Sequence, residues 1–378
     1  MNPYVLYYNN LTPNLVADSN VRFRYDYYAN VGSFCPYSCN GQVVNTCYQD
    51  PSVCQNFSSE KLVANQPSNA LHLDVNLSDP WGILIVNNVI WVANSGSGLI
   101  TSYKLDGKPM DTIINVLGPI DNISTPTGLA SNKDISLFVI TKNRKSRPAT
   151  FLVATIDGTI HGYNSEVDPR NALLVVNNSP NGSVYKGLTL ADGYLYVADF
   201  YNGVVDVYDG EFKRVTNFPF VDEYSADPIP DSYAPYNIVH IGGLLYVLYA
   251  KRDPGDSQKE LHGMGNGYIS IFSKNGVFIR RFVSRGVLDT PWGMIPTPSS
   301  FGFPPGAMMV SNFGNGIINI FDYNGNWLGS LKDKNGNSIC ISGIRSLATS
   351  SNGKSIYISS SSDFSKNSFI SIVGEKIL

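Results

Sequence analysis

A two-part unit that recurs six times along the chain is the feature that most restricts its fold. Its second part is an apolar run, a turn rich in Asn and Gly, and another apolar run, as in LYVADFYNGVVDVYDG from Leu195. The copies begin at Trp91, Phe151, Leu195, Leu245, Met308 and Ile356. Short apolar runs with alternating polarity, separated by such turns, are typical of β-hairpins. The chain is therefore predicted to consist of repeated antiparallel strands.

A first marker precedes each copy in the same order. The markers are DPWGIL at Asp79, TPTGLA at Thr125, VYKGLTL at Val184, APYNIV at Ala234, TPWGMI at Thr290 and ISGIRSL at Ile341. Turn glycines recur 45 to 64 residues apart, at Gly98, Gly158, Gly203, Gly267 and Gly316. This spacing is expected of propeller blades rather than of helical solenoids. With a fourth strand after most copies, the pattern predicts an all-β fold, a six-bladed β-propeller with four-stranded blades.

The last unit has almost no residues after Val373 from which to build a fourth strand. Residues 61 to 78, by contrast, precede the first marker and belong to no complete unit. We expect this N-terminal segment to supply the missing strand and to close the ring, which leaves no open edge between the first and last blades. The predicted domains are an N-terminal extension, residues 1–60, and the propeller, residues 61–378.

Asn94, Asp199 and Asn312 end the second strands, and short polar side chains at such positions stabilise turns by bonding to nearby backbone. We interpret them as turn residues, with contact to a ligand as the alternative. The Asn-Gly turns are predicted to be two-residue hairpins, because Asn and Gly tolerate positive φ.

Four of the five cysteines lie close together in the extension, at Cys35, Cys39, Cys47 and Cys54. Their spacings do not match the paired C-x2-C pattern of structural zinc sites, so disulfides are favoured over zinc, with three connectivities open. Pairing between chains is a further alternative, and it would make residues 1–60 a device for self-assembly or for contact with protein partners. Cys340, in SICISGI, is interpreted as a buried small hydrophobic residue.

Disulfides indicate an oxidising compartment or an extracellular particle. Consensus N-glycosylation sites at Asn56, Asn76, Asn122 and Asn181 point the same way, with little weight in a chain so rich in Asn and Ser. The N-terminus lacks a basic region followed by a long apolar core, so we expect no secretory signal peptide. No apolar run reaches the length of a membrane-spanning helix.

Candidate ligand residues lie at the first markers, because the loops of a propeller meet at the mouth of its central channel. They are Asp79, Trp81, Asn237, Asp289, Trp292 and Arg345. Oxygen ligands suit a hard divalent cation, but no Glu accompanies these residues, and the favoured interpretation is packed tryptophans and turn-capping carboxylates. The sequence contains neither H-E-x-x-H nor G-x-S-x-G, so an enzyme is not favoured. No cofactor is expected, and a divalent cation is the one alternative.

Charged residues make up 15% of the chain, the net charge is -3, and no basic stretch alternates with aromatic residues. Nucleic acid is therefore not an expected partner. Residues 251–265, KRDPGDSQKELHGMG, form the one long charged loop expected within a blade. We interpret it as a solvated loop that decorates one face, with partner contact as the alternative.

The units resemble the NHL and SMP-30-like group of six-bladed propellers. From Lys61 to the C-terminus the chain is similar to an uncharacterised propeller family of bacterial exported proteins and giant DNA viruses of amoebae. The segments that carry this resemblance are NLSDPWGI at Asn76, ATIDGTIHGYN at Ala154, VYKGLTLADGYLYVADFYNGVVDVYD at Val184, SYAPYNIVHIGGLLYVLYA at Ser232, GMGNGYISIF at Gly263, DTPWGM at Asp289 and NFGNGIINIFD at Asn312. The resemblance implies no known reaction. The N-terminal extension, the lack of a C-terminal sorting segment and the Asn, Ile, Tyr and Lys bias favour a giant-virus origin, and hence a virion or extracellular location.

The sequence thus favours a non-enzymatic binding or assembly propeller, a structural or surface component of a giant-virus particle. The first alternative is a metal-dependent hydrolase of the SMP-30 or lactonase kind at the channel mouth. The second is a carbohydrate-binding propeller that uses exposed Tyr and Trp side chains.

Overall fold

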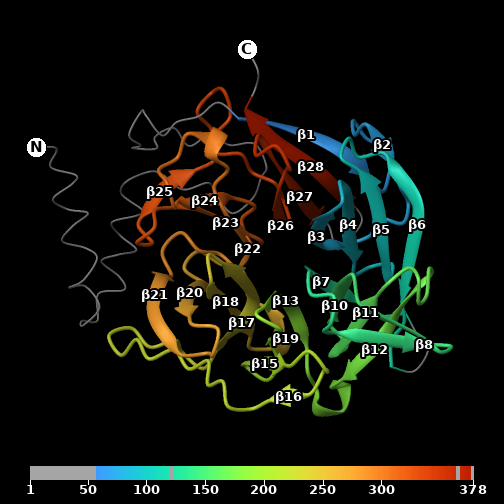
Figure 1. Cartoon of the computed structure of the whole chain (residues 1–378). Coiled ribbons are helices and arrows are strands. Elements are labelled where there is room, and N and C mark those ends of the chain that lie inside the picture. Colours follow the sequence, from blue (N-terminus) through green and yellow to red (C-terminus); the bar gives the residue numbers. More distant parts are fainter. Residues whose placement is uncertain (1–56, 120–122, 363–366, 376–378) are drawn as a thin grey trace, which may run out of the picture.

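The computed structural model describes residues 57–119, 123–362 and 367–375. Within these ranges the chain forms β-sheets arranged around a central axis (Figure 1). The helices in the same ranges are two single 3-10 turns, Ser179–Asn181 and Ser299–Phe301. In the described part of the chain no helix is long and apolar enough to span a membrane.

The strands follow one another in antiparallel groups that each begin at a first marker. The first group comprises β3 (Pro80–Val86), β4 (Val89–Asn94), β5 (Leu99–Lys104) and β6 (Pro109–Val116). The second comprises β7 (Pro126–Ser131), β10 (Phe151–Thr155), β11 (Thr159–Tyr163) and β12 (Asn171–Asn177), with an inserted hairpin of β8 (Val139–Lys142) and β9 (Lys145–Pro148). The third comprises β13 (Tyr185–Ala191), β14 (Tyr194–Asp199), β15 (Val204–Tyr208) and β16 (Arg214–Val215).

The remaining groups complete the circle. The fourth comprises β17 (Tyr233–Ile241), β18 (Leu244–Asp253), β20 (Gly267–Phe272) and β21 (Phe278–Ser284), with β19 (Asp256–Glu260) paired to the end of β18. The fifth comprises β22 (Pro291–Pro296), β23 (Met308–Asn312), β24 (Ile318–Phe321) and β25 (Trp327–Ser330). The last comprises β26 (Ile344–Thr349), β27 (Ser355–Ser362) and β28 (Asn367–Glu375), joined by β1 (Phe57–Ala64) and β2 (His72–Leu73).

The larger sheets number five in the described residues, in place of the six separate four-stranded sheets expected. The first two groups merge into one eight-stranded sheet because their outer strands β6 and β12 pair in parallel, Asn115 with Asn171 and Val116 with Ala172. The third, fourth and fifth groups each form their own sheet, and the last forms a five-stranded sheet.

The N-terminal and C-terminal strands lie side by side in the last sheet (Figure 1). Strand β1 pairs antiparallel with β28, and β2 pairs in parallel with β1. Strand β1 begins at Phe57, earlier than the segment from residue 61 expected to contribute a strand, and within the extension assigned to residues 1–60. Pairing of β1 and β28 covers an edge that would otherwise be open to other chains.

The Asn-Gly turns between second and third strands are longer than two residues, which corrects the expectation. Four residues separate β14 from β15, and the Gly203 N–H closes this loop on the Asp199 carbonyl at 2.9 Å with a φ of +73° at Gly203. Two-residue turns with positive φ at both positions instead connect the first strand to the second in the first, third and fourth groups, as at Asn87 and Asn88. Gly267 is not a turn glycine: it begins β20, where a Cβ would meet Pro291 at 2.6 Å.

Apolar side chains fill the spaces between neighbouring sheets. One cluster, for example, joins Met309 and Ile320 of the fifth group to Leu347 and Ile358 of the last group. The first strands of the groups, β3, β7, β13, β17, β22 and β26, line a cavity of about 270 Å³ on the axis. Sheets packed face to face around such an axis make the fold a β-propeller.

Candidate ligand site at one end of the central channel

One residue of each first-marker strand, the third of five strands and the fifth of β17, lies where neighbouring strands approach closely on the axis. These residues are Gly82, Gly128, Gly187, Asn237, Gly293 and Ser346. A Cβ on Gly82 would lie 2.8 Å from the Thr127 carbonyl oxygen, and one on Gly293 would lie 2.5 Å from the Arg345 carbonyl oxygen. The fourth and sixth strands bear side chains here, and the Ser346 hydroxyl accepts the Ile83 N–H at 3.1 Å. The strands therefore form a tight ring.

In each first-marker strand, the residue one position before the ring residue is buried. These residues are Trp81, Thr127, Lys186, Tyr236, Trp292 and Arg345. The pairing register of each strand shifts at this point, for example between Pro80 and Ile83 in β3 and between Pro235 and Asn237 in β17. Bulges of this kind change the direction of a side chain and are frequent beside functional sites. Here they gather two cations and three large aromatic side chains at one end of the channel.

Arg345 lies in the centre of this group. Its Nη1 donates to Asp79 Oδ1 at 2.8 Å, and its guanidinium is 4.3 Å from the ring centres of both Trp81 and Phe313. Trp81 Nε1 donates to the other oxygen of Asp79 at 3.0 Å. Asp79 also has a φ of +47°, as Thr290 has +53° at the equivalent position before β22. Backbone strain of this kind is concentrated at functional sites.

Lys186 is the second buried cation. Its Nζ lies 3.3 Å from Glu260 Oε2 and 5.3 Å from the ring centre of Trp81, and its side chain is 5% exposed. Burial raises the pKa of Glu260, but the charges of Lys186, Arg345 and His262 and a backbone hydrogen bond together hold this pKa below its ordinary value. Glu260 is therefore ionised and neutralises Lys186 at neutral pH.

Aromatic rings pack around the two cations. The rings of Trp81 and Trp292 meet edge to face at 6.0 Å, and Phe200 and Tyr236 do so at 5.3 Å. Trp292 Nε1 donates to the Lys186 carbonyl at 2.9 Å. Burial, with the neighbouring charge of Glu260, raises the pKa of Tyr236 well above its ordinary value, so its hydroxyl keeps its proton. The arrangement is a box in which cations face ring surfaces.

Asp289 lies at the edge of this group. It accepts the Gly263 N–H at 2.8 Å, and burial raises its pKa. Gly314 packs against it so closely that a Cβ there would lie 2.0 Å from Asp289 Oδ1. The hydroxyl oxygen of the neighbouring Thr290 is 3.2 Å from His262 Nδ1. The ring centres of His262 and Phe313 are 4.9 Å apart. Asp289 therefore shapes the turn before β22.

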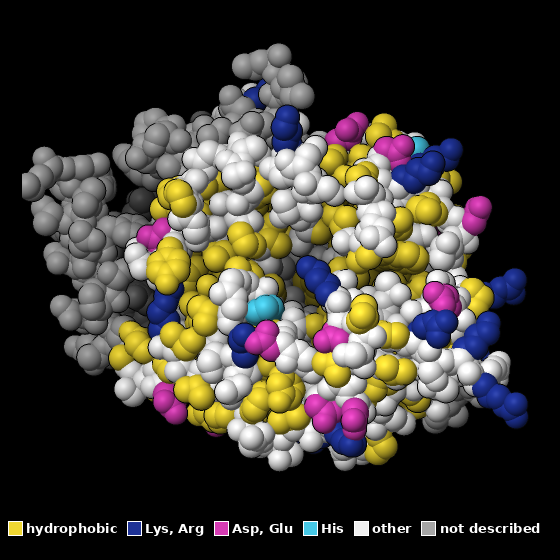
Figure 2. Space-filling model, in the orientation of Figure 1, with side chains coloured by type: hydrophobic (Ala, Val, Ile, Leu, Met, Phe, Trp, Pro, Cys, Tyr) yellow, Lys and Arg dark blue, Asp and Glu magenta, His cyan; other side chains and the backbone are white. Residues whose placement is uncertain are grey.

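The cavity on the axis extends from the tight ring toward the opposite end of the strands. Apolar side chains such as Leu84, Leu190 and Ile295 line it, together with Ser131 and Thr189. Figure 2 shows a central hollow on the face in view, bordered by hydrophobic side chains. The cavity and the charged box therefore lie on either side of the ring of close contacts.

The sequence singled out several members of the box but missed others. The structure brings Asp79, Trp81, Trp292 and Arg345 together, and Asn237 joins them because its Nδ2 donates to the Trp292 carbonyl at 2.7 Å. Lys186, Tyr236 and Glu260 were not singled out. A position-by-position alignment of the first markers would have found Lys186 and Tyr236, since both occupy the register position of Trp81.

The interpretation of residues 251–265 as a solvated loop is wrong in part, because residues 251–253 continue β18 and Asp256–Glu260 form β19. Strand β19 folds back on β18, with Glu260 opposite Arg252, and this turns the Glu260 carboxylate inward to Lys186. Lys259 on the same strand is exposed. A loop can be solvated at most positions and still place one side chain in the site.

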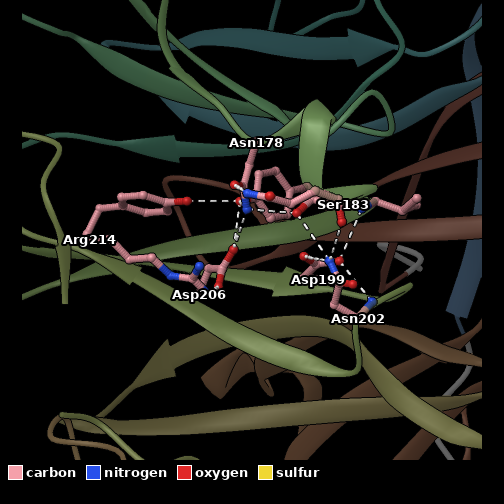
Figure 3. Close-up of polar contacts among 10 residues, drawn as sticks. Asn178, Ser183, Asp199, Asn202, Asp206 and Arg214 are labelled. Atoms are coloured by element: carbon pink, nitrogen blue, oxygen red, sulfur yellow. Dashed lines mark hydrogen bonds and ion pairs between the residues drawn. The ribbon is translucent and has the colours of Figure 1, made fainter. Parts of the chain in front are cut away.

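The turn residues behave as interpreted. Asp199 accepts the N–H groups of Val184 at 3.1 Å and Asn202 at 3.2 Å, and it also binds the Asn202 side chain at 2.8 Å (Figure 3). In the same view Asp206 accepts hydrogen bonds from Asn178 at 3.2 Å and from Arg214. Asn94 and Asn312 donate to the carbonyls of Leu99 and Val287. These side chains therefore hold the turns in place and link neighbouring groups of strands.

The described residues hold no group of three or more His, Cys, Asp or Glu side chains that could bind a metal ion. The ligand candidates Asp79 and Asp289 bind Arg345 and a turn N–H. Trp81 and Trp292 are buried, and Trp91 and Trp327 are half-buried, so no tryptophan of the described chain offers an exposed platform for a sugar.

The disulfide candidates Cys35, Cys39, Cys47 and Cys54 and the glycosylation candidates Asn56 and Asn122 lie outside the described residues. Asn181 is exposed, and Asn76 is half-buried with its Nδ2 bonded to Asp74 at 3.0 Å. Cys340 is half-buried and takes part in a disulfide. The interpretation of Cys340 as a buried hydrophobic residue is therefore wrong.

Comparison with known proteins places the chain among viral relatives. It is 44% identical over 289 residues to "Uncharacterized protein R648" of Acanthamoeba polyphaga mimivirus, covering 76% of this chain and 72% of the relative. It is 42% identical over 326 residues to "Uncharacterized protein L690" of the same virus, covering 83% of this chain and 87% of the relative. The chain belongs to this mimivirus protein family. No family model matches it.

Solved structures similar to this member of the mimivirus family share little sequence with it. A protein of unknown function from Bacteroides thetaiotaomicron has a TM-score of 0.52 at 11% identity, covering 85% of this chain and 76% of that one. A streptogramin B lyase has a TM-score of 0.49 at 13% identity, covering 85% and 98%. The WD40 β-propeller domain of Doa1 has a TM-score of 0.48 at 10% identity, covering 84% and 97%. Likeness at this identity concerns the fold alone.

Proposed function

We propose that this protein is a non-enzymatic binding and assembly propeller of a giant-virus particle. The single observation that supports this most is that both cations at the channel end are neutralised inside the fold, Lys186 by Glu260 and Arg345 by Asp79. Such pairs, packed on Trp81, hold a structure together and leave neither Lys186 nor Arg345 free to act as an acid, base or nucleophile. Membership of a mimivirus family is consistent with the viral part of the proposal.

We further propose a six-bladed ring. On this interpretation the eight-stranded sheet consists of two blades, β3 to β6 and β7 with β10 to β12, which are joined where β6 pairs with β12. Each of the six inner strands then belongs to a separate blade. The resemblance to NHL and SMP-30-like propellers and to bacterial exported proteins remains part of this proposal.

An exposed basic hairpin supports contact with a partner. The turn between β8 and β9 has positive φ at Asn143 and Arg144, and the hairpin extends from the rim of the second group (Figure 1). Lys142 and Arg147 pair with acidic residues at its base, whereas Arg144 and Lys145 are exposed near its tip. A cationic projection on a chain of net charge -3 favours encounter with an acidic protein surface.

Self-assembly through the N-terminal extension is the other part of the proposal. Strand β1 begins at Phe57, so a variant that lacks residues 1–54 keeps the complete sheet pairing of β1. In infected amoebae we expect tagged full-length protein to enter purified particles, measured by quantitative mass spectrometry. The shortened variant is expected to fold but to enter particles at a reduced level. Absence of the full-length protein from particles, or equal incorporation of both forms, would refute the proposal.

The metal-dependent hydrolase has less support, because Asp79 already binds Arg345 and Trp81. Its test is metal analysis of the purified protein together with a thermal shift on addition of calcium or zinc. A bound divalent cation would revive this alternative. Specific binding on a glycan array would do the same for carbohydrate recognition.

A further inference from the structure

Glu260 reaches the channel end from an insertion in the fourth group. Between the second and third strands of that group, β18 continues to Asp253 and turns back as β19, which ends at Glu260. The pairing of β19 with β18 is confined to two residue pairs. The side chain of Glu260 is 12% exposed, and that of its partner Lys186 is 5% exposed. The Glu260 carboxylate, on a short hairpin, is thus inserted between Lys186, Arg345 and the aromatic rings around them. We call this buried part of the box the recess.

The recess has more hydrogen-bond donors than Glu260 uses. Arg345 Nε is buried and has no hydrogen-bond partner among the described residues, although Nη1 of the same side chain binds Asp79. The fully buried Tyr236 hydroxyl has no hydrogen-bond partner in the described structure other than the neighbouring Glu260 carboxylate. Buried donors are normally satisfied, and a group left without a partner calls for an explanation such as a bound ligand or water.

The walls of the recess restrict what fits beside these donors. Trp81, Phe200 and Tyr236 surround Lys186 at 5.3, 5.7 and 6.0 Å from its Nζ. An anion with a compact charged head and an apolar body matches such surroundings. The net charge of Lys186, Arg345 and Asp79 is one positive unit, which a singly charged carboxylate balances and a phosphate dianion exceeds.

We propose that the recess is a binding site for a small free carboxylate, and that Glu260 is an internal occupant which this ligand displaces. Exchange of one carboxylate for another leaves the charge of the recess unchanged, while a ligand free of the chain can also approach Arg345 Nε and the Tyr236 hydroxyl. Release of Glu260 breaks the short pairing of β19 and leaves the sheet of β17, β18, β20 and β21 intact. This site is additional to the assembly role and does not rest on it.

Replacement of the internal carboxylate tests the proposal directly. Glu260→Ala is expected to lower Tm, and sodium acetate is expected to restore it in a saturable manner, whereas sodium chloride at equal ionic strength does not. Calorimetric titration is expected to show acetate binding to the variant about tenfold more tightly than to the unmodified protein, because Glu260 no longer competes. In the unmodified protein, saturating acetate is expected to accelerate trypsin cleavage after Lys259.

Two variants serve as controls. Glu166→Ala removes an exposed carboxylate that pairs with Arg147, and no acetate-specific rise in Tm is expected from it. In the double variant Lys186→Met with Glu260→Ala, the acetate effect is expected to disappear. If Glu260→Ala does not fold, Glu260→Gln keeps the side-chain shape, and its acetate affinity is compared in the same way. Equal responses to acetate and chloride, or an acetate effect that survives loss of Lys186, would overturn the proposal.

Discussion

Gly187 of β13 and Asn237 of β17 are so close at the channel axis that a Cβ on Gly187 would lie 1.9 Å from Asn237 Oδ1. Movement of the Asn237 side chain would break a hydrogen bond, because its Nδ2 donates to the Trp292 carbonyl in β22, the inner strand of the next group. The contact sets the spacing of three neighbouring inner strands, and with it the position of Lys186.

Gly187→Ala is therefore expected to lower the free energy of unfolding by about 1–3 kcal/mol, as insertion of a methyl group into a close-packed contact does. Gly255→Ala is the control, because Gly255 is exposed and the nearest atom to a Cβ there is Asp253 Oδ1 at 3.2 Å. Chemical denaturation of both variants measures the difference. Equal stability of the two would show that the inner strands can move apart freely.

Arg345→Met is expected to destabilise the protein by about 3–5 kcal/mol, because it leaves the Asp79 carboxylate without its cation in a largely buried position. Arg147→Met removes an exposed pair with Glu166, for which a change below about 1 kcal/mol is expected. Urea unfolding of both variants at neutral pH provides the comparison. Similar losses would mean that the pair at the channel end contributes no more than a surface pair.

His161 links stability to pH. Burial lowers its pKa from 6.5 to about 4, against the opposing charge of Asp157, and its Nε2 is 2.9 Å from the Thr159 hydroxyl. Between pH 6.5 and about 4 the unfolded chain binds a proton here that the folded chain does not, so the free energy of unfolding falls as pH falls. The contribution of this residue is up to about 3 kcal/mol.

The test compares unfolding in urea at pH 7.5 and pH 4.5. His161→Gln is expected to show a smaller loss of stability between these conditions than the unmodified protein. His72→Gln, on β2, serves as the matched substitution and is expected to keep the original loss. An unchanged loss in His161→Gln would exclude this residue as the source.

Cys340 provides a covalent test of how the chain is connected. It takes part in a disulfide, and the remaining cysteines of the sequence are Cys35, Cys39, Cys47 and Cys54. Peptide mass spectrometry without reduction is expected to find the Cys340 peptide linked to a peptide from residues 35–54. A free Cys340 thiol in protein purified under oxidising conditions would contradict this expectation.

The repeat was sufficient to predict the strands and the β-propeller, because strand periodicity and turn residues are local properties. It could not predict the pairing of β6 with β12, since Asn115 and Asn171 meet only after two groups have packed together. The candidate site was partly predicted for a related reason. Trp81 and Trp292 stand out as rare residues in a repeated motif, whereas Glu260 enters the site through the fold of β19 and carries no local signal.

The shared sheet of the first two groups also affects how copies of this protein can meet. Outer strands of β-sheets have unpaired backbone groups that can recruit a strand from another molecule. At β6 and β12 part of these groups is already used within the chain, by the pairs at Asn115 and Val116. Lateral addition of a foreign strand is thus hindered on this side of the ring.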